Sequence, residues 1–392
     1  MDTVTYPDQA VSEILKQFVC IRVEFDKVPE LVKQFHVEPL PDLRILDNEA
    51  NELHQFIGFS SAKKLTGVCQ NVLDQRAGRT VSGGGPDPAK QPIEVTAAAI
   101  EKAVQQGLDY LATSFQQGWP QAGYGYEEIA LYAMQSGGAT VSNATVLKLL
   151  KIVLERTPEN TYQTAFCALA LGRLEPRQYH DKLQECADFL CASQLENGQW
   201  TYQPQAGNAR QQNGDHSNSA YALLGLYACQ EAGIEVPGEV IQKAAATWRT
   251  TQNQDGGWGY RSDREMASYA SMTENGISSL ILCQIMLNKS QPDDAQQERA
   301  IHWLGEHYSV AENLKSSYQQ GRHLYHLYAL ERLGALLKTD LLAGHGWYAD
   351  AAQYLLSNQT ATGAWDDGSD TPVPNTCFAL LVLTKATRNW NK

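Results

Sequence analysis

The sequence predicts a mainly helical α+β chain in which six helical hairpins close into an (α/α)6 toroid, preceded by a small α/β domain. Two observations lead to this prediction. Only 19% of the 392 residues are charged, whereas about a quarter is usual. From Thr96 onward, amphipathic helices alternate with helices that are apolar nearly all round. Because an apolar helix must be covered on every side, the alternation indicates an outer ring of helices around an inner ring.

The alternation gives boundaries for both rings. Outer helices are expected near 97–115, 142–155, 181–194, 238–252, 294–308 and 347–359. Inner helices are expected near 126–136, 161–173, 218–232, 273–287, 323–337 and 375–387. The inner helices would have no side facing water, which accounts for the low share of charged residues.

Three outer helices end at the same motif, Gln-x-x-x-Gly-x-Trp. The copies are Gln194 to Trp200, Gln252 to Trp258 and Gln359 to Trp365, and a weaker copy ends at Trp119. The second spacing is nearly twice the first, which indicates a degenerate copy between them. We expect the glycine to end the helix in a conformation other residues avoid, the tryptophan to pack back onto the helix end, and the glutamine to bond free backbone groups.

These copies, with the segments NGDHSNSAYALLGL, NQDGGWGYRSD and ASMTENGISSL, resemble the squalene-cyclase and prenyltransferase repeat family from Thr96 to the C-terminus. The resemblance implies an α/α toroid whose central cavity is lined by the N-terminal ends of the inner helices. The superfamily includes toroids that bind without catalysing, so the resemblance predicts fold more strongly than activity.

The first part of the chain is expected to alternate element types over residues 6–75 in the order α-β-α-β-β-α. The elements are PDQAVSEILKQ, FVCIRVEF, VPELVKQF, DLRILD, HQFIGF and a helix from Ser60 to about Leu73. This order, with Pro41 before a strand and ILDNEANELHQFIGF as a closing hairpin, resembles the thioredoxin-like fold with Pro41 at its cis-proline position. The family's first strand and Cys-x-x-Cys should precede Tyr6, and we find neither. We therefore expect residues 1–76 to be a redox-silent packing or docking domain, followed by a Gly/Pro-rich linker at 77–95 and the toroid at 96–392.

Composition restricts the partners and the compartment. A formal net charge of −13, from 31 basic and 44 acidic residues, argues against nucleic acid or an anionic membrane surface as the main partner.

The eight cysteines form no Cys-x-x-Cys and lie mostly in apolar stretches, which is typical of buried thiols in a reducing compartment. No apolar run approaches the roughly 18 residues of a transmembrane segment. The first residues lack a signal-peptide pattern, so we expect a cytoplasmic protein. Because the first domain lacks its expected first strand, the sequence does not indicate whether Met1 is the biological start.

Polar residues gather where the inner helices begin, at the end where helix dipoles favour anions and acidic side chains. Polar groups converging on an apolar ring predict a pocket. The expected ligand-binding residues are Tyr126, Glu127, Tyr162, Asp215, His216, Asn218, Glu274, Asn275, His323 and His326. The candidate catalytic acids or bases are Asp215, Glu127 and Glu274. Several of these residues also have a structural interpretation: Asp215 as a helix cap, Glu127 as a partner of the helix dipole, and His323 and His326 as core or rim residues bonded to neighbours.

The sequence can be compared with the proton-donor motif of the cyclases residue by residue. Triterpene cyclases of the family protonate an alkene with an Asp-x-Asp-Asp motif, whose middle acid is the donor. The matching segment is Asp215-His216-Ser217-Asn218, so Ser217 takes the donor's place. A hydroxyl is far too weak an acid for that step, and we expect no protonation-initiated cyclisation.

The motifs that other toroids use for zinc binding or thioester chemistry are not matched by this sequence. Prenyltransferases hold zinc with an aspartate, a cysteine and a histidine, but no Asp-x-Cys opens an inner helix and Cys377 has no aspartate at the right spacing. His323 and His326 would offer two zinc ligands without an apparent third. We therefore predict no cofactor, with zinc as the alternative. Thioester toroids need a cysteine where GYGYEE has tyrosine.

Aromatic pairs at the expected rim also suit a polysaccharide. They are Trp119 with Tyr124 and Tyr126, Trp200 with Tyr202, and Trp258 with Tyr260. Aromatic faces stack on sugar rings, and carboxyl groups beside them would supply an acid or a base. The leading hypothesis is a cyclase-like toroid without its proton donor that binds an apolar, isoprenoid-like or extended ligand, or a protein partner, at this rim. The alternatives are a noncanonical terpenoid cyclase or prenyl-transforming enzyme, and a carbohydrate-active lyase or hydrolase.

Overall fold

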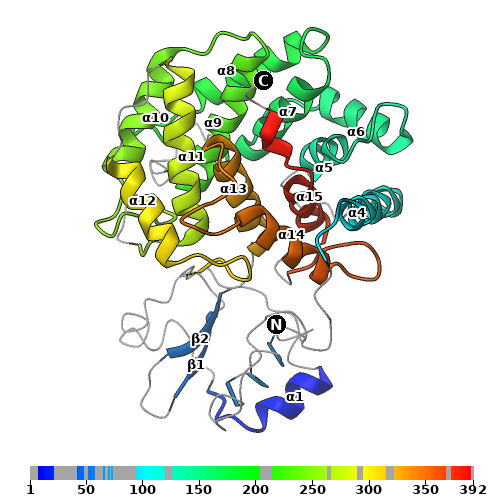
Figure 1. The fold of residues 1–392 in the computed structure, drawn as a ribbon, viewed down its shortest axis with the longest axis vertical. Helices are drawn as coiled ribbons and strands as arrows, with labels where there is room; N and C mark the ends of the chain where they lie inside the picture. Colours follow the sequence, from blue (N-terminus) through cyan, green and yellow to red (C-terminus); the bar gives the residue numbers. More distant parts are fainter. Residues whose placement is uncertain are drawn as a thin grey trace. The chain divides into compact units, whose positions relative to one another are not determined.

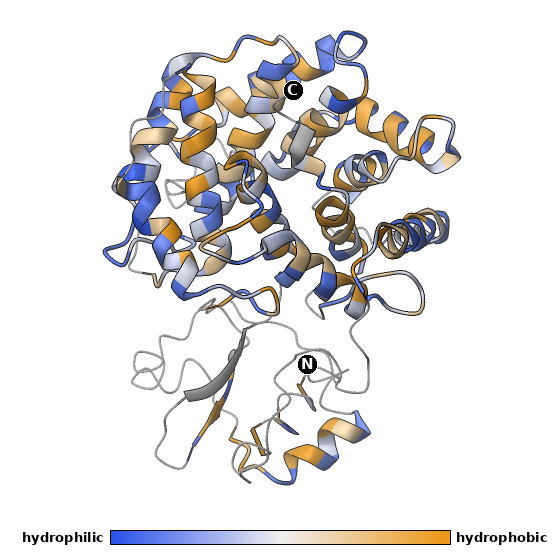
Figure 2. Cartoon of the chain, in the orientation of Figure 1, coloured by the Kyte–Doolittle hydropathy of each residue, from blue (hydrophilic) through white to orange (hydrophobic). Residues whose placement is uncertain are grey.

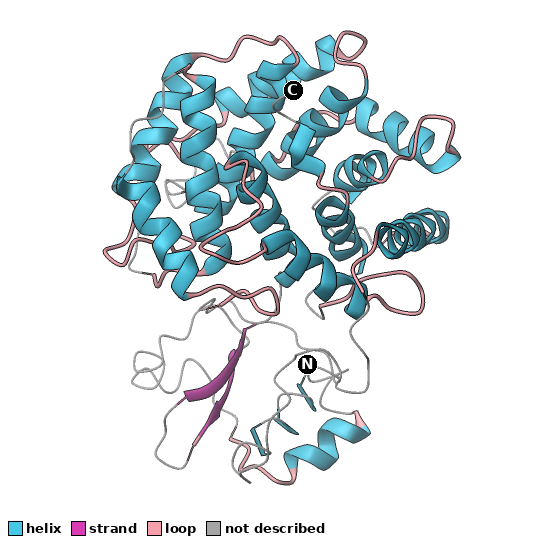
Figure 3. Ribbon diagram, viewed as in Figure 1, coloured by secondary structure: helices cyan, strands magenta, loops and turns pink. Residues whose placement is uncertain are grey.

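The computed structural model describes residues 8–21, 42–47, 52–57, 65–66, 69–70, 72–73, 94–119, 126–203, 214–262, 266–288, 295–314, 322–367 and 372–389. It divides into two compact units, Met1–Lys90 and Gln91–Lys392. In these described ranges the smaller unit holds both strands, α1 and the helical residues between 65 and 73, and the larger unit holds the other helices (Figure 3).

The smaller unit contains α1 (Gln9–Leu15), capped by the Asp8 side chain, and an antiparallel pair, β1 (Asp42–Leu46) and β2 (Glu52–Ile57). The strand pair confirms the expected hairpin. Leu65, Thr66, Cys69, Gln70, Val72 and Leu73 are helical, within the helix expected there. The core of this unit joins Val11 and Ile14 of α1 to Ile45 of β1 and to Leu65, Cys69 and Val72.

The strand expected at FVCIRVEF is wrong for its first residues. Residues 19–21 have no regular secondary structure, and the side chains of Val19 and Ile21 are 91% and 79% exposed. β-branched residues favour strands when they pack on a neighbouring surface, and side chains this exposed gain little from extended backbone. The helix expected at VPELVKQF and Pro41 lie outside the described residues, so the thioredoxin-like interpretation stays a prediction.

The larger unit is a ring of alternating outer and inner helices (Figure 1). The outer helices are α4 (Ala97–Gln117), α6 (Ala144–Glu155), α8 (His180–Ala192), α10 (Gly238–Thr250), α12 (Ala295–Glu306) and α14 (Trp347–Asn358). The inner helices are α5 (Tyr126–Ser136), α7 (Thr161–Leu174), α9 (His216–Glu231), α11 (Ala270–Met286), α13 (His323–Leu336) and α15 (Pro372–Leu383). Each inner helix packs on the next, and α15 returns to α5. This closed ring confirms the (α/α)6 toroid.

Burial differs between the two rings as the sequence predicts. The inner helix α11 buries every residue from Ala270 to Gln284, whereas the outer helix α10 buries only Val240, Ile241, Ala244 and Trp248. In Figure 2 the outer helices α10 and α12 are accordingly more hydrophilic than the inner helix α15. The low charge content of the sequence therefore follows from helices that have no water-facing side.

The motif glutamines join neighbouring outer helices. Gln194 Nε2, after α8, donates to Val240 O of α10 at 2.9 Å, and Gln252 Nε2, after α10, donates to Gln296 O of α12 at 2.8 Å. Gln359 Nε2, after α14, donates to Ala103 O of α4 at 2.9 Å. Each amide also donates to the carbonyl of its own motif glycine, at 2.8–3.2 Å. These are the backbone bonds that we expected, and we call them the glutamine clamps.

The motif tryptophans join outer helices to inner ones, and all three are at most 1% exposed. Each indole N–H donates back to a carbonyl of the preceding outer helix, on Leu190, Trp248 or Leu355, at 2.7–3.0 Å. Each backbone N–H donates to a hydroxyl in the first turns of the next inner helix, on Ser219, Thr273 or Thr376, at 3.1–3.2 Å. The tryptophans therefore pack back onto the helix ends, as expected.

Two other outer-helix contacts use different chemistry. Tyr308 Oη, after α12, donates to Asp350 Oδ2 in the first turn of α14 at 2.8 Å, where the degenerate motif copy is expected. Lys182 Nζ of α8 donates to Arg156 O, after α6, at 2.7 Å. A tyrosine and a lysine thus make the contact that glutamine makes elsewhere.

The motif glycines have left-handed φ angles of 83°, 94° and 87° and lie against the next outer helix. A Cβ on Gly363 would be 2.4 Å from Gln106 O of α4, and one on Gly256 would be 2.9 Å from Arg299 O of α12. Glycine is therefore required both for its backbone conformation and for the close approach of two outer helices.

We expect Gly363→Ala to destabilise the toroid by more than about 3 kcal/mol, because strain at positive φ of roughly 1–2 kcal/mol adds to the clash with α4. Gly233→Ala is the matched control, since Gly233 has a φ of 89° and no atom within 4 Å of the Cβ position. Urea unfolding of both variants measures the difference. Equal losses would show that closure of the ring does not depend on this approach.

Candidate functional site

The starts of the inner helices α7 and α9 are held by side-chain caps and by the loops that follow two of the motifs. The side chains of Asn160 and Asp215 cap α7 and α9. Thr161 N, in the first turn of α7, donates to Tyr202 O at 3.0 Å, and His216 N of α9 donates to Tyr260 O at 3.0 Å. Tyr202 and Tyr260 each lie two residues after a motif tryptophan. The motif therefore also places a tyrosine beside the start of an inner helix.

A chain of hydrogen bonds crosses the inside of the inner ring, and we call it the cross-barrel chain. Ser217 Oγ of α9 lies 2.5 Å from Tyr162 Oη of α7 and 2.6 Å from Tyr325 Oη of α13. Asn275 Nδ2 of α11 donates to Tyr325 Oη at 2.7 Å, and Arg332 Nη2 of α13 donates to Asn275 Oδ1 at 2.7 Å. Four inner helices therefore contribute to one continuous polar network.

Arg332 is the cation at the end of this chain and is only 1% exposed. Its guanidinium carbon lies 4.3 Å from the ring centroid of Tyr328 and 5.1 Å from that of Tyr221, both within cation–π distance. Its Nη1 donates to Tyr221 Oη at 3.3 Å. Burial raises the pKa of Tyr221 well above its ordinary value, so the hydroxyl stays protonated. The inside of the barrel thus holds a permanent positive charge on aromatic faces.

Three tyrosines near the helix starts are only partly buried, unlike Tyr221 and Tyr328. We call Tyr162, Tyr202 and Tyr260 the rim tyrosines. The rings of Tyr162 and Tyr202 stack with centroids 5.6 Å apart and an interplanar angle of 19°. The hydroxyls of Tyr202 and Tyr260 are 3.4 Å apart. The rim tyrosines therefore form one aromatic surface that begins at the cross-barrel chain.

Asp215 lies beside the rim tyrosines and is 5% exposed. Its two carboxylate oxygens accept hydrogen bonds from Asn218 N and Asn218 Nδ2, each at 2.8 Å. Burial raises the pKa of Asp215 to about 6, although hydrogen bonds from Asn218 and Tyr260 partly offset the shift. Asp215 is therefore both a helix cap and a carboxyl group that titrates near neutral pH.

Glu274 of α11 and His326 of α13 form a buried pair, with His326 Nδ1 3.0 Å from Glu274 Oε2. His326 Nε2 lies 2.9 Å from Ser309 O. A carbonyl only accepts, so Nε2 carries a proton, and a second proton lies between Nδ1 and Glu274. Burial by itself lowers the pKa of His326, but Glu274 and the hydrogen bonds outweigh it and raise the pKa above its ordinary value.

The remaining predicted residues lie apart from the cross-barrel chain. His216 uses both ring nitrogens, 2.7 Å from Gly259 O and 2.9 Å from Thr251 Oγ1, and burial lowers its pKa to about 4. His323 Nε2 lies 2.8 Å from Val310 O, and burial and His326 lower the pKa of His323 to about 4. Glu127 and Glu128 both accept from Arg156, at 3.2 and 2.6 Å. Tyr126 opens α5 and is half-buried.

Our prediction from the sequence did not include Tyr221, Tyr325, Tyr328 and Arg332 among the residues of the site. The available signal was the charged pair Glu331-Arg332 inside a helix that otherwise reads as apolar all round. A charge on a fully covered helix must find partners inside the protein. Glu331 bonds Thr387 N and Oγ1 at 3.0 and 2.6 Å, while Arg332 joins the cross-barrel chain.

The part of the chain that the structure describes shows neither a metal-binding group of side chains nor a membrane-spanning helix. Within it, no group of three or more His, Cys, Asp or Glu side chains is arranged to hold a metal ion. None of its helices combines the length and the apolar character that a membrane crossing requires. All eight cysteines are free thiols in this structure.

Comparison with known proteins identifies the fold. No family model and no curated protein matches the sequence. A possible GH105-family member from Salmonella enterica covers 78% of this chain and 98% of its own, at 13% identity and a TM-score of 0.53. The structure of a heparin-specific unsaturated glucuronyl hydrolase covers 74% of this chain and 97% of its own chain, at 12% identity and a TM-score of 0.52. A variant of the Scytonema type II terpene cyclase MstE, in complex with geranylgeranyl dihydroxybenzoate, covers 74% and 98%, at 13% identity and 0.51. The shared fold is the α/α toroid.

The raised pKa of Asp215 makes stability depend on pH. A carboxyl group whose pKa is higher in the folded state binds more protons when the chain is folded. The free energy of unfolding therefore falls as the pH rises from 3.8, the pKa of the group in the unfolded chain, to about 6, its pKa in the folded state. Asp215→Asn keeps a capping oxygen and removes this titration. We expect the variant to gain stability relative to wild type, by up to about 3 kcal/mol, between about pH 4 and about pH 7. Urea unfolding across this range measures the gain, and a difference independent of pH would contradict it.

Proposed function

We propose that the toroid binds an extended polar ligand of the carbohydrate class at the rim tyrosines and that it does not cyclise terpenes by protonation. The observation that carries this proposal is Arg332, whose charge lies inside the barrel against the faces of Tyr221 and Tyr328. Terpene cyclisation proceeds through carbocations, which aromatic faces stabilise. Here a guanidinium already occupies two such faces, and its charge repels a second cation.

Ser217 supports the same conclusion. Its hydroxyl takes the place of the family's proton donor and lies between the hydroxyls of Tyr162 and Tyr325. Burial raises the pKa of Tyr162 well above its ordinary value, so this neighbour is also a poor acid. The group needed to protonate an alkene is therefore missing from that position.

The rim tyrosines favour a saccharide over an isoprenoid. Aromatic faces can stack on the apolar faces of sugar rings, and the phenol hydroxyls and the Asp215 carboxylate can bond the hydroxyl groups of a sugar, which an isoprenoid chain lacks. Arg332 also makes the barrel interior favourable for an anionic sugar. The similar heparin-specific glucuronyl hydrolase acts on such a ligand; at 12% identity it supports the choice of ligand class through fold alone.

Calorimetric titration tests this proposal with an unsaturated glucuronyl disaccharide prepared from heparin and, in parallel, geranylgeranyl dihydroxybenzoate. We expect wild type to bind the disaccharide and Tyr202→Leu to weaken binding about tenfold, equivalent to about 1.4 kcal/mol. Tyr110→Leu, on the outer helix α4, is the control and should bind like wild type. Mass spectrometry follows the isoprenoid. Binding of the isoprenoid alone, or its cyclisation by wild type, would overturn the proposal.

Hydrolysis of an unsaturated uronide is a second candidate function, favoured by the pKa of Asp215 of about 6. A group with this pKa is protonated often enough near neutral pH to act as a general acid. It lies beside the rim tyrosines, where a bound sugar would be. Asp215 would donate its proton to the double bond of the uronide, water would add to the cation that forms, and the proton released from that water would return to the Asp215 carboxylate. The hydrated ring is a hemiketal that opens to a hemiacetal, whose collapse breaks the bond to the rest of the sugar and releases it as an alcohol.

If Asp215 is the general acid, turnover should fall as pH rises through about 6, because the protonated form is lost. We expect Asp215→Asn to reduce turnover of the unsaturated disaccharide at least about 100-fold while binding persists. Asp109→Asn, on the exposed side of α4, is the control. The loss of ultraviolet absorbance of the double bond measures the rate. Undiminished turnover in Asp215→Asn would exclude this role.

A further inference from the structure

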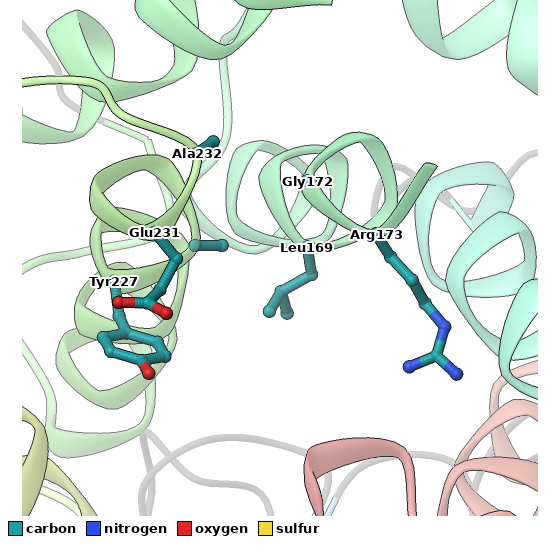
Figure 4. Close-up of a pocket in the computed structure, with 7 residues that line it drawn as sticks. Leu169, Gly172, Arg173, Tyr227, Glu231 and Ala232 are labelled. Carbon is teal, nitrogen blue, oxygen red and sulfur yellow. The ribbon is translucent and has the colours of Figure 1, made fainter. Parts of the chain in front are cut away.

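A cavity lies at the ends of the inner helices opposite to the rim tyrosines. It has a volume of about 440 Å³ and lies between the last turns of α7 and α9 (Figure 4). The 14 residues of α7 span about 20 Å, so this cavity is well separated from the rim tyrosines at the helix starts. Its volume is in the range of small-molecule sites. Nothing in the candidate site described above accounts for it.

Opposite charges face this cavity from its two sides. Figure 4 shows the Arg173 guanidinium on one side, the Glu231 carboxylate and Tyr227 on the other, and the apolar Leu169 side chain between them. Among the described residues, Arg173 and Glu231 form no ion pair with each other. Two unlike charges separated by an apolar floor are complementary to a molecule that carries both charges at its ends.

Both charged groups are oriented by contacts within the protein. Arg173 Nη1 donates to Ala386 O at 3.3 Å, in the segment η3 (Ala386–Asn389). Tyr227, which is 3% exposed, donates its hydroxyl to Glu231. Burial and the Glu231 carboxylate raise the pKa of Tyr227 to about 12, so the hydroxyl keeps its proton. One N–H of five is used on Arg173, and the carboxylate of Glu231 keeps further lone pairs for a ligand.

The helix ends add a directional field. The last carbonyls of α9, the helix that carries Glu231, have partial negative charge, which reinforces Glu231 and attracts a cation to that side. Gly172, Ala228 and Ala232 line the cavity with small side chains and leave room between the charges. We propose that this cavity is a binding site for a small zwitterion, whose ammonium group contacts Glu231 and Tyr227 and whose carboxylate contacts Arg173, with a short apolar segment over Leu169.

This site shares no residue with the proposed carbohydrate site. Failure of saccharide binding would therefore leave the zwitterion site untouched, and the reverse also holds.

The probe is 6-aminohexanoate, titrated into the full chain by calorimetry. Hexanoate and hexylamine are the matched probes, because each lacks one of the two charges. We expect saturable binding of 6-aminohexanoate and at least tenfold weaker binding of both matched probes. Raising the salt concentration should weaken binding, because both contacts are ionic.

Three variants locate the site. Arg173→Met and Glu231→Gln each remove one charge, and Arg177→Met and Glu235→Gln are exposed controls outside the cavity. Gly172→Leu fills the cavity. A Cβ on Gly172 would lie 3.6 Å from Ala228 O, an ordinary contact, so the variant should fold with an unchanged unfolding temperature. We expect at least tenfold loss in the three cavity variants and none in the controls.

Three outcomes would overturn the proposal: no binding of 6-aminohexanoate by wild type, equal binding of hexanoate or hexylamine, or unchanged binding in folded Gly172→Leu. Circular dichroism of each variant establishes folding before titration.

Discussion

Closure of the ring is the constraint on which the rest of this structure depends. Six inner helices with almost no water-facing side are stable only when each is covered by two inner neighbours and an outer helix. The glutamine clamps join three pairs of outer helices, and the bond from Gln359 to Ala103 connects residues 256 positions apart in the chain. An open stack of repeats would need capping repeats at both ends, whereas this bond and the packing of α15 on α5 remove both ends.

Closure also decides the chemistry of the interior. Many polar groups inside the ring are buried, and a buried polar group without a partner is costly. Arg332 is consequently bonded to Asn275 and Tyr221, and Glu274 to His326. The same shielding raises the pKa of Asp215 and lowers that of His216. The candidate site therefore depends on ring closure: burial raises the pKa of Asp215, and the buried charge of Arg332 has to be bonded inside the protein.

The two ends of the ring have different chemistry because all inner helices run in the same direction. At their starts, backbone N–H groups and capping side chains meet the rim tyrosines and Asp215. At their last turns, backbone carbonyls meet Arg173, Tyr227 and Glu231 around a separate cavity. The two binding positions that we propose, one at each end, therefore share no residue with each other.

Local pattern was enough to determine the helices and their arrangement. The alternation of amphipathic and apolar helices predicted all twelve toroid helices to within a few residues, and the repeated motif predicted the glutamine and tryptophan contacts. Only the tertiary structure decided the candidate site, because its contacts cross the ring: Ser217 meets Tyr325 over 108 positions and Tyr221 meets Arg332 over 111. The strand expected at Val19 and Ile21 was wrong for a similar reason, since a strand is stabilised by packing on a neighbouring surface, which sequence alone does not reveal. Sequence determines which side of a helix must be covered, and packing across the ring determines which polar groups then meet.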